Sequence, residues 1–563
     1  MDWVVSQSER SLSLEKYEVH RTKGGTLRYT SSRNLQVLER RNEPFGVASG
    51  QLFGPLADPD NLSGQKDAEG LGDLALKSEG SFSVAILHDE KITLVTDAGG
   101  SIPVFYGRGP EGFAVGTLVH HVATLSGLDD IDKVSVADYL LNGTICYPYS
   151  WYERVQEAQA GSVISFDHEG IAEHHTYWQP TEPDNVREDC NSEKWGKHLN
   201  EQIKEAVRLG VEGKSKGRVL YSGGVDSRAV LSLVPSSFEC IPTTVTDFKN
   251  QEYRVAKRSA RLLGRELDRI RRPEDHYRSS IRELIDTIGP GWDFTHAHIS
   301  RQVGDQFKDA DVILGGYLAD TFFKTLWMPD VRSGRFRPDR LLPALPNTVT
   351  GIDLDKMSDL SLWSNLIGRV LERRKDHHER LKKLRPKTAG SWHQKFPLSN
   401  QPHFAHYLAP LRVGPSMIEP FAFSGTYRLA AKMPDTARVD MRAFRHAFAS
   451  EMGLAGWWPT SSGEICTLED KYFGHMAQAI SHRWLRFRRN LNPFPVEGAW
   501  SPDAAGWSPV HPERHFSDSE CQALERHLDD LFAGGIGADV FENEDVSDEM
   551  KVRALTLAFD TPG

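Results

Sequence analysis

The stretch VLYSGGVDS, residues 219–227, joins three apolar residues to a polar loop with two adjacent glycines. Apolar residues recur at helical spacing in the following RAVLSLV, which predicts that the loop lies between a strand and a helix. At the carboxyl end of a parallel strand, glycines let backbone N–H groups approach a ligand, and the N-terminus of the next helix adds positive potential. We therefore predict a polyphosphate-binding loop made of Ser222, Gly223, Gly224, Val225, Asp226 and Ser227.

Asp226 adds a negative charge to this predicted phosphate site. A carboxylate beside a phosphate is unfavourable unless a cation lies between them, and Mg²⁺ is the divalent cation that carboxylates and phosphates commonly share. The alternative is an incidental glycine turn. Five specified positions at a strand–helix junction favour the phosphate loop over that alternative.

The pattern of the chain changes near residue 190. Before it, short alternating runs such as SFSVAILHDEKITLVTD are separated by Gly, Pro and Asp, which is typical of strands. After the Pro- and acid-rich segment 176–193, strand and helix patterns alternate, which predicts a doubly wound parallel sheet. The prediction is a two-domain α/β protein with a β-rich sandwich in residues 1–188 and the parallel-sheet domain in residues 189–563.

Composition excludes several classes of protein. The formal charge of -11 over 563 residues argues against a nucleic-acid-binding function. The five cysteines are scattered without a C-x-x-C pair, so we expect neither a disulfide framework nor a zinc site. We expect the protein to be cytoplasmic. No apolar run approaches the roughly 20 residues of a membrane span. The basic segment 372–387 predicts a solvated helix face, with a peptide or RNA contact as the alternative.

Three ordered segments resemble one known group of enzymes. SGGVDS resembles the pyrophosphate-binding loop of the ATP pyrophosphatase (PP-loop) superfamily, and VILGGYLADTFF (312–323) and MIEPFAFSGTYRLAAKMP (417–434) are similar to the later signatures of its asparagine synthetase branch. The resemblance implies that ATP and Mg²⁺ activate a carboxylate as an acyl-adenylate, that pyrophosphate leaves, and that an amine attacks to form an amide. In the N-terminal half, GSFSVAILHDEKITLVTDAGGSIPVFYG (80–107) resembles the glutaminase domain of asparagine synthetases, which implies an amidotransferase-like domain of the Ntn (N-terminal nucleophile) type.

The resemblance assigns roles to individual residues. Asp226 and Asp320 match the two magnesium-ligand positions, although Asp320 is also explained as an acidic residue in the first turn of a helix. The strand edges at Leu220 and Val245 match the segments that pass the adenine, and Gly316 belongs to the second signature.

Departures from the family narrow the function. The glutaminase nucleophile is a cysteine directly after the initiator Met, and here that residue is Asp2. A carboxylate cannot form the thioester, so we expect no glutamine hydrolysis. The domain would persist as a structural partner, as it does in β-lactam synthetases and lasso-peptide cyclases. We expect a macrolactam cyclase, a peptide or a small carboxylate/amine as substrate, and a leader peptidase and a precursor-recognition protein as partners.

Tyr317 stands where asparagine synthetases have Glu and β-lactam synthetases have Tyr, which implies a base for amine attack, or else a packing residue. His403 and His406 are the candidate partners of this tyrosine. The phosphate-contacting lysine of the family aligns with Ser461, and Lys471 is the candidate replacement. Besides the cyclase, three alternatives remain: a β-lactam-forming enzyme, an ammonia-dependent asparagine synthetase, and a non-catalytic protein that keeps the nucleotide fold.

Overall fold

The computed structural model describes most of the chain. The described residues are 1–7, 17–22, 25–40, 43–64, 67–88, 91–167, 170–183, 191–273, 275–324, 360–467, 476, 480–481, 483, 516–532, 540–541, 546 and 548–559. Lys471 and the predicted domain boundary at residues 188/189 lie outside them. Among the described residues, no helix combines the length and the apolar character needed to cross a lipid bilayer.

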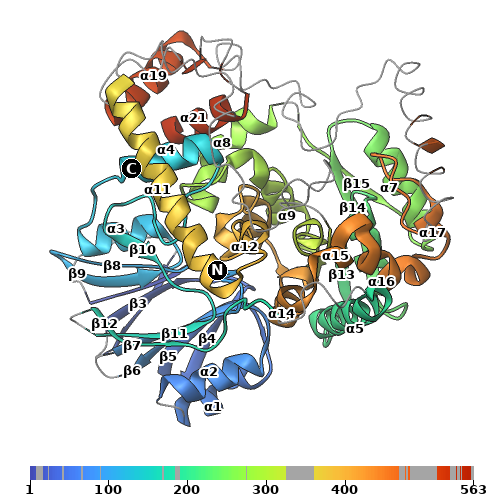
Figure 1. Ribbon diagram of the computed structural model, residues 1–563, viewed down its shortest axis with the longest axis horizontal. Helices are drawn as coiled ribbons and strands as arrows, with labels where there is room; N and C mark the ends of the chain where they lie inside the picture. Colours follow the sequence, from blue (N-terminus) through green and yellow to red (C-terminus); the bar gives the residue numbers. More distant parts are fainter. Residues whose placement is uncertain are drawn as a thin grey trace.

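Two six-stranded sheets form the N-terminal part, with neighbouring strands antiparallel throughout (Figure 1). Side chains alternate between the faces of each strand, so one apolar face of each sheet packs against the other sheet, and the second face also carries buried apolar side chains. The shared core includes Trp3, Val47 and Phe113. In sheet order the first sheet is β10 (Val155–Glu157), β8 (Phe105–Gly109), β9 (Gly112–Gly116), β1 (Trp3–Ser6), β3 (Gly25–Thr30) and β2 (Tyr17–Thr22), and the second is β12 (Gly170–Thr176), β11 (Ser162–Asp167), β7 (Lys91–Thr96), β6 (Glu79–His88), β5 (Glu43–Phe53) and β4 (Leu35–Arg40).

A five-stranded sheet with all neighbours parallel forms the core of the C-terminal part (Figure 1). Its order is β15 (Asp268–Arg271), β14 (Glu239–Thr246), β13 (Lys216–Leu220), β16 (Val312–Leu314) and β17 (Ser416–Ile418). Along the chain, the central strand β13 comes first and is followed by β14 and β15 on one side of it. The chain then crosses to the other side of β13 and forms β16 and β17. The predicted mixed α/β organisation, with a β-rich part first and a parallel sheet second, is confirmed, and the β-rich part is antiparallel.

The helices connect and cover these sheets. Short ones flank the N-terminal sheets, and most of the others surround the parallel sheet (Figure 1). Their bounds are α1 Pro59–Gly64, α2 Ala68–Leu76, α3 Val119–Ser126, α4 Lys133–Asn142, α5 Ser192–Val211, α6 Val225–Leu233, α7 Gln251–Leu262, α8 His276–Ile288, α9 Ser300–Gln306, α10 Ala319–Phe323, α11 Leu360–Leu384, α12 Ala389–Trp392, α13 Ala405–Val413, α14 Ser424–Lys432, α15 Asp435–Arg438, α16 Arg442–Met452, α17 Leu454–Trp457, α19 Asp518–Phe532 and α21 Asp548–Phe559.

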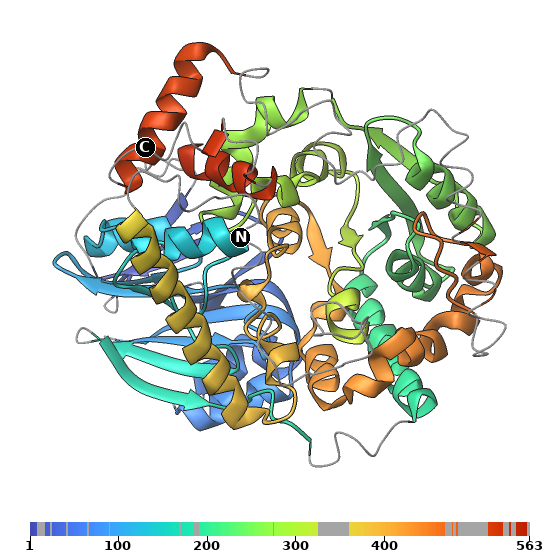
Figure 2. The same cartoon turned by 45° about the horizontal axis from the view of Figure 1, so that its top comes forward.

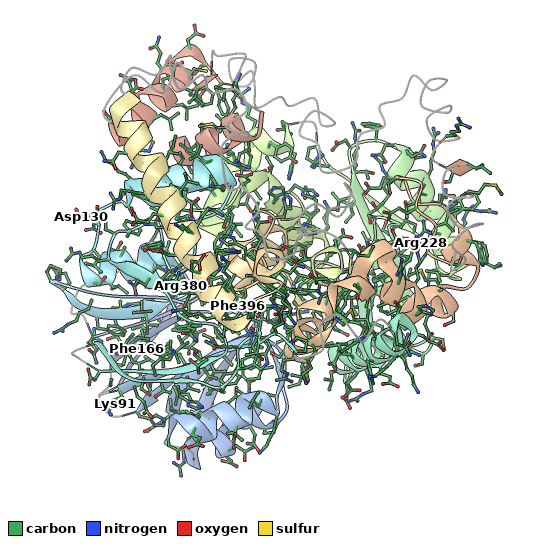
Figure 3. The ribbon with its side chains drawn as sticks, in the orientation of Figure 1. Lys91, Asp130, Phe166, Arg228, Arg380 and Phe396 are labelled. Carbon is green, nitrogen blue, oxygen red and sulfur yellow. The ribbon has the colours of Figure 1, made fainter. Side chains whose placement is uncertain are left out.

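The two parts of the chain are joined by buried polar and aromatic contacts. Asn34, at the start of the turn into β4, donates its amide N–H to the carbonyls of Leu411 (2.8 Å) and Pro415 (3.1 Å). Its amide oxygen accepts from the backbone N–H of Met417 (3.0 Å) in β17. At another point of the junction, Trp178 packs edge-on against Phe396, which is labelled in Figure 3. The N-terminal sandwich therefore holds the edge strand of the parallel sheet.

Helix α11 carries the basic segment and lies across the N-terminal part (Figure 2). Arg374 forms a buried ion pair with Asp138 of α4 (2.6 Å), and Arg373 pairs with Asp132 (2.6 Å). Arg385, just beyond the helix, is buried and donates to backbone carbonyls that include that of Pro180. The expectation of a solvated face is therefore wrong for these arginines, because acidic partners on α4 and backbone carbonyls satisfy their charges in the interior.

Candidate active site

A cavity of about 470 Å³ lies at the carboxyl ends of the parallel strands, where the strand order reverses between β13 and β16. Open α/β sheets bind ligands at this position, because the loops that leave the two central strands diverge there. Its walls come mainly from the loops after β13 and β16 and from α13 with its preceding turn. The lining includes Leu220, Ser222, Asp226, Ser227, Val245, Gly316, Tyr317, Asp320, His403 and Glu419.

The first loop, residues 221–227, turns sharply from β13 into α6. Gly223 has φ 74°, in the left-handed region, and a Cβ there would lie 2.7 Å from the backbone of Ala256 in α7. The Oγ of Ser222 accepts the backbone N–H of Gly224 (3.2 Å). Tyr221 ties the loop to α7 by donating to Ser259 (2.8 Å). Gly223 therefore provides the tight turn at this loop. Val225 is buried beneath the loop, so only its backbone is available to a ligand.

The second loop, residues 315–318, passes directly over the first. A Cβ on Gly316 would lie 3.0 Å from the carbonyl carbon of Asp226, and one on Gly315 would lie 1.9 Å from a carboxylate oxygen of Glu419. Leu318 has φ 72°, a conformation that is uncommon outside glycine and costs conformational energy. The pair of glycines is needed because the Glu419 carboxylate lies against Gly315 and the main chain of Asp226 and Ser227 lies against Gly316.

Asp226 and Asp320 converge on one ammonium group, that of Lys324. The Nζ of Lys324 lies 2.7 and 2.9 Å from the two oxygens of Asp226 and 2.5 Å from Asp320 Oδ1. Burial and the charge of Asp320 raise the pKa of Asp226 to about 7, even though Lys324 opposes the shift. Burial alone would lower the pKa of Lys324, but the two carboxylates outweigh it and raise that pKa.

The same pair of carboxylates suits a magnesium ion whose coordination is completed by a bound ligand. Among the described residues, no cluster of three or more metal-binding side chains is present. Mg²⁺ in phosphoryl-transfer sites is commonly held by one or two carboxylates together with substrate phosphates and water. Asp226 and Asp320 supply the hard oxygen donors of such a site. They fit the ion provided that phosphate oxygens and water supply its other ligands.

Glu419 lies beside Tyr317. The backbone N–H of Tyr317 donates to Glu419 Oε2 (2.9 Å), and Glu419 is 3% exposed. Burial raises the pKa of Glu419 to about 8. The Tyr317 phenol donates to Gln401 (3.4 Å), and burial together with the Glu419 charge raises its pKa well above the ordinary value. Of these two groups, the carboxyl is the one that can exchange a proton near neutral pH.

Histidines form the wall opposite the phosphate loop. His403, the predicted partner of Tyr317, instead contacts His296 through ring nitrogens 2.9 Å apart. The neighbouring His406 packs its ring edge-on to Tyr317, with centroids 5.5 Å apart. Burial lowers the pKa of His406 to about 3 and that of His298 well below its ordinary value, so both rings are neutral at physiological pH. This wall is polar without adding positive charge to the cavity.

Comparison with known proteins identifies the group to which this site belongs. The sequence model described as "Asparagine synthase" matches residues 198–508, more than half of the chain and the part that carries both loops. The chain belongs to the asparagine synthase family.

Individual relatives are distant. The chain is 26% identical over 145 residues to "Amidase chry2" of Gibberella zeae, and the match covers 22% of each chain, so it spans about a fifth of that relative. Two solved structures align at low similarity. An allosteric regulatory enzyme of purine biosynthesis has 9% identity and a TM-score of 0.19, covering 48% of this chain and 75% of its own. The glutamine phosphoribosylpyrophosphate amidotransferase from B. subtilis has 10% identity and a TM-score of 0.18, covering 39% and 54%.

The segment that carries the family's phosphate-contacting lysine has no cation in its described part. Ser461 is partly exposed at the lysine position, and Glu464 lies close enough to Asp226 to contribute to the rise of its pKa. Arg228, labelled in Figure 3, reaches this segment from α6, but its guanidinium donates to the carbonyls of Ala455 and Pro459. Arg228 therefore holds the segment in place, and it also interacts with the Tyr221 phenol at the start of the first loop.

Asp2, the residue at which the sequence resemblance places the glutaminase nucleophile, forms an ion pair. Asp2 pairs with Arg412 Nε (3.1 Å) beside an open cavity of about 1240 Å³ between the two parts of the chain. The Arg412 guanidinium also donates to the carbonyls of Thr117, Thr287 and Ile288. The amine of Met1 donates to Thr30 Oγ1 (3.1 Å). The nucleophile position thus holds a carboxylate whose charge is already neutralised.

Proposed function

We propose that this member of the asparagine synthase family is an AMP-forming amide ligase that activates a carboxylate with ATP and joins it to an amine of its own substrate. Amide formation driven by ATP is the general activity of the family. The observation that carries the finer proposal is the meeting of the 222–227 loop, the Asp226/Asp320 pair and the buried Glu419 in one cavity. These are the parts that phosphate binding, charge neutralisation and proton removal require.

The phosphate end of the reaction belongs to the first loop. Backbone N–H groups at the start of α6 and the hydroxyls of Ser222 and Ser227 would bind the phosphates, with the helix N-terminus adding partial positive charge. Asp226 and Asp320 would hold Mg²⁺, which would neutralise charge on the departing pyrophosphate. Leu220 and Val245, which line the cavity at the ends of β13 and β14, would contact the nucleoside.

The amine end belongs to Glu419 and Tyr317. An amine must lose a proton as it attacks, and a group with a pKa near the working pH accepts it best. Ionised Glu419 is such a base. The Tyr317 phenol would orient the amine or relay its proton to Glu419, because its own raised pKa makes it a poor base alone.

The amine comes from the substrate in this proposal. Asp2 in place of the cysteine argues against release of ammonia from glutamine, so both reacting groups can belong to one molecule. We place a peptide that closes into a macrolactam of the lasso-peptide type first, and a small molecule that closes into a β-lactam second. Ammonia-dependent asparagine synthesis and nucleotide binding without catalysis are the outcomes that would displace both.

The test is ATP–pyrophosphate exchange by the purified full-length protein, with Mg²⁺ and one candidate substrate at a time. The candidates are peptides that carry a free N-terminus and an acidic side chain, an N-carboxyalkyl amino acid, and aspartate with ammonia. We expect exchange with one of the first two classes and a cyclic product that is lighter by one water. Exchange with aspartate and ammonia, or binding of ATP without exchange in any mixture, would reject the proposal.

A further inference from the structure

The cavity is acidic although the proposed ligand is a polyanion. Its lining includes the carboxyl groups of Asp226, Glu252, Asp320 and Glu419, and no lysine or arginine occurs among the described residues that line it. A triphosphate in such a cavity would meet unfavourable charge at short range, where the interior screens it poorly. The helix N-terminus contributes only about half a positive charge. Besides the Mg²⁺ that Asp226 and Asp320 would hold, a side-chain cation near the lining would lower this repulsion further.

Lys324 is the cation in that position. It follows α10 directly and reaches back one helical turn to Asp320 and across 98 residues of sequence to Asp226. Its side chain is 10% exposed, and its ammonium lies 5.3 Å from the centroid of the Phe444 ring in α16. The ammonium thus sits between the two carboxylates on which the phosphate site depends.

The way Lys324 is held differs from that of the buried arginines. Arg272 makes two hydrogen bonds to Asp247 and one to Tyr277, which keep its planar guanidinium in one orientation. The polar contacts of Lys324 go to Asp226 and Asp320, and its ammonium is a point charge on a flexible stem. A rotation of that stem can move the charge from the carboxylates toward a phosphate oxygen. Such a rotation leaves no carbonyl of the fold without a donor.

We infer that Lys324 is the residue of this chain that faces the phosphates of ATP, supplying the charge that the family takes from the position of Ser461. The inference rests on the proposed ATP-dependent function and adds a residue to it. In the nucleotide-free state the ammonium neutralises Asp226 and Asp320. With Mg²⁺ on the carboxylates and phosphate beside them, the ammonium turns to the phosphate. The candidate Lys471 becomes the competing outcome of the test.

The experiment measures equilibrium binding of ATP, with and without Mg²⁺, to the wild-type protein and to four variants, one of which, Lys471→Met, removes the competing candidate. Lys324→Gln keeps hydrogen bonds to the carboxylates but removes the charge, and Lys324→Arg keeps the charge. Lys216→Met is the matched control, because Lys216 pairs with Asp309 (2.9 Å) at the opposite end of β13. Melting temperatures establish that each variant is folded.

We expect Lys324→Gln to weaken Mg·ATP binding about 10- to 100-fold, the usual loss for one charge-assisted contact to phosphate. Lys324→Arg should retain binding within a few-fold, and Lys216→Met should match the wild type. A structural role alone would lower the melting temperature of Lys324→Gln and leave its ATP affinity unchanged, which would overturn the inference. The same holds if Lys471→Met, and not Lys324→Gln, weakens binding.

Failure of the proposed function is distinguishable from failure of this inference. If the wild-type protein does not bind ATP at all, both are rejected. If the wild-type protein binds and exchanges pyrophosphate while Lys324→Gln does the same, the ligase assignment stands and Lys324 is a counter-ion. Should Lys324→Gln fail to fold, Lys324→Arg and Lys471→Met carry the test, and a loss only in Lys471→Met overturns the inference.

Discussion

Two cavities in this molecule each contain a carboxylate paired with a cation, and the cations are held in different ways. In the N-terminal cavity Asp2 meets Arg412, which also donates to three backbone carbonyls. In the parallel-sheet cavity Asp226 meets Lys324, whose polar contacts are carboxylates. The first cation is part of the scaffold and the second can be released. The two ion pairs thus differ in the other hydrogen bonds that their cations make.

The largest effects are expected when the carboxylate of each ion pair is replaced, Asp226 in the parallel-sheet cavity and Asp2 in the N-terminal cavity. We expect Asp226→Asn to reduce ATP–pyrophosphate exchange below detection, because it removes a magnesium ligand while Lys324 keeps its charge. Asp320→Asn should behave in the same way. Asp2→Asn is the control and should exchange like the wild type. Wild-type exchange by both Asp226→Asn and Asp320→Asn would contradict the assignment of the site.

The base assignment predicts a loss confined to the second half-reaction. Glu419→Gln should lower amide formation by about 10²–10⁴ and leave exchange within a few-fold of the wild type, because proton removal follows adenylation. Tyr317→Phe should show the same pattern. Amide formation at the wild-type rate in Tyr317→Phe would leave Tyr317 as a packing residue and Glu419 as the base. Loss of exchange in either variant would place that residue at the phosphate end.

The raised pKa of Glu419 also predicts a pH dependence of stability. The protonated form is favoured in the folded state, so stability is full below the ordinary pKa of 4.5 and is lost as pH rises toward the folded pKa of about 8. At about 1.4 kcal/mol for each unit of pKa, the loss approaches 4 to 5 kcal/mol. The melting temperature of the wild type should therefore fall more between pH 5 and 9 than that of Glu419→Gln. Parallel curves would mean that the carboxyl titrates normally.

Arg412 should matter for stability and not for catalysis. Arg412→Met leaves Asp2 and three backbone carbonyls without their donor, which costs about 3 kcal/mol or more in a buried setting. We expect a lower denaturation midpoint in urea with unchanged ATP affinity. A large change in ATP affinity would mean that the two cavities communicate.

For glutamine hydrolysis we expect no activity at all. Glutamine should yield no glutamate when it is incubated with the protein, and its addition should not change the rate of amide formation, because Asp2 cannot form the thioester. The assay is glutamate release followed over hours at high protein concentration. Measurable glutamate would place a nucleophile elsewhere in the N-terminal cavity.

Local patterns predicted more of this protein than long-range contacts did. Ser222, Asp226, Gly316 and Asp320 were predicted from two short segments, and the structure brings them to one cavity because adjacent strands end at the same sheet edge. Glu419 was missed as a partner of Tyr317 because 102 residues separate them. The signal was present in the glycine pair of LGGY, since a side chain at Gly315 would collide with Glu419.

Ion pairs between residues far apart in sequence were missed for the same reason. Lys324 follows the second signature by one residue, but its importance depends on Asp226, 98 residues earlier. Arg373 and Arg374 belong to a segment whose composition favours exposure, and their acidic partners lie on a helix more than two hundred residues away in sequence. Hydropathy along the chain cannot detect a partner that only the tertiary fold supplies.

The contacts of Asn34 bear on the order in which the chain is made. Its side-chain partners are the carbonyls of Leu411 and Pro415 and the backbone N–H of Met417. The ribosome adds these residues nearly four hundred positions after Asn34. The contacts between Asn34 and β17 can therefore form only after this strand, the last of the parallel sheet along the chain, has been synthesised. The N-terminal part thus has a structural role whatever its chemistry, since without Asn34 the backbone N–H of Met417 and the carbonyls of Leu411 and Pro415 would lose this partner.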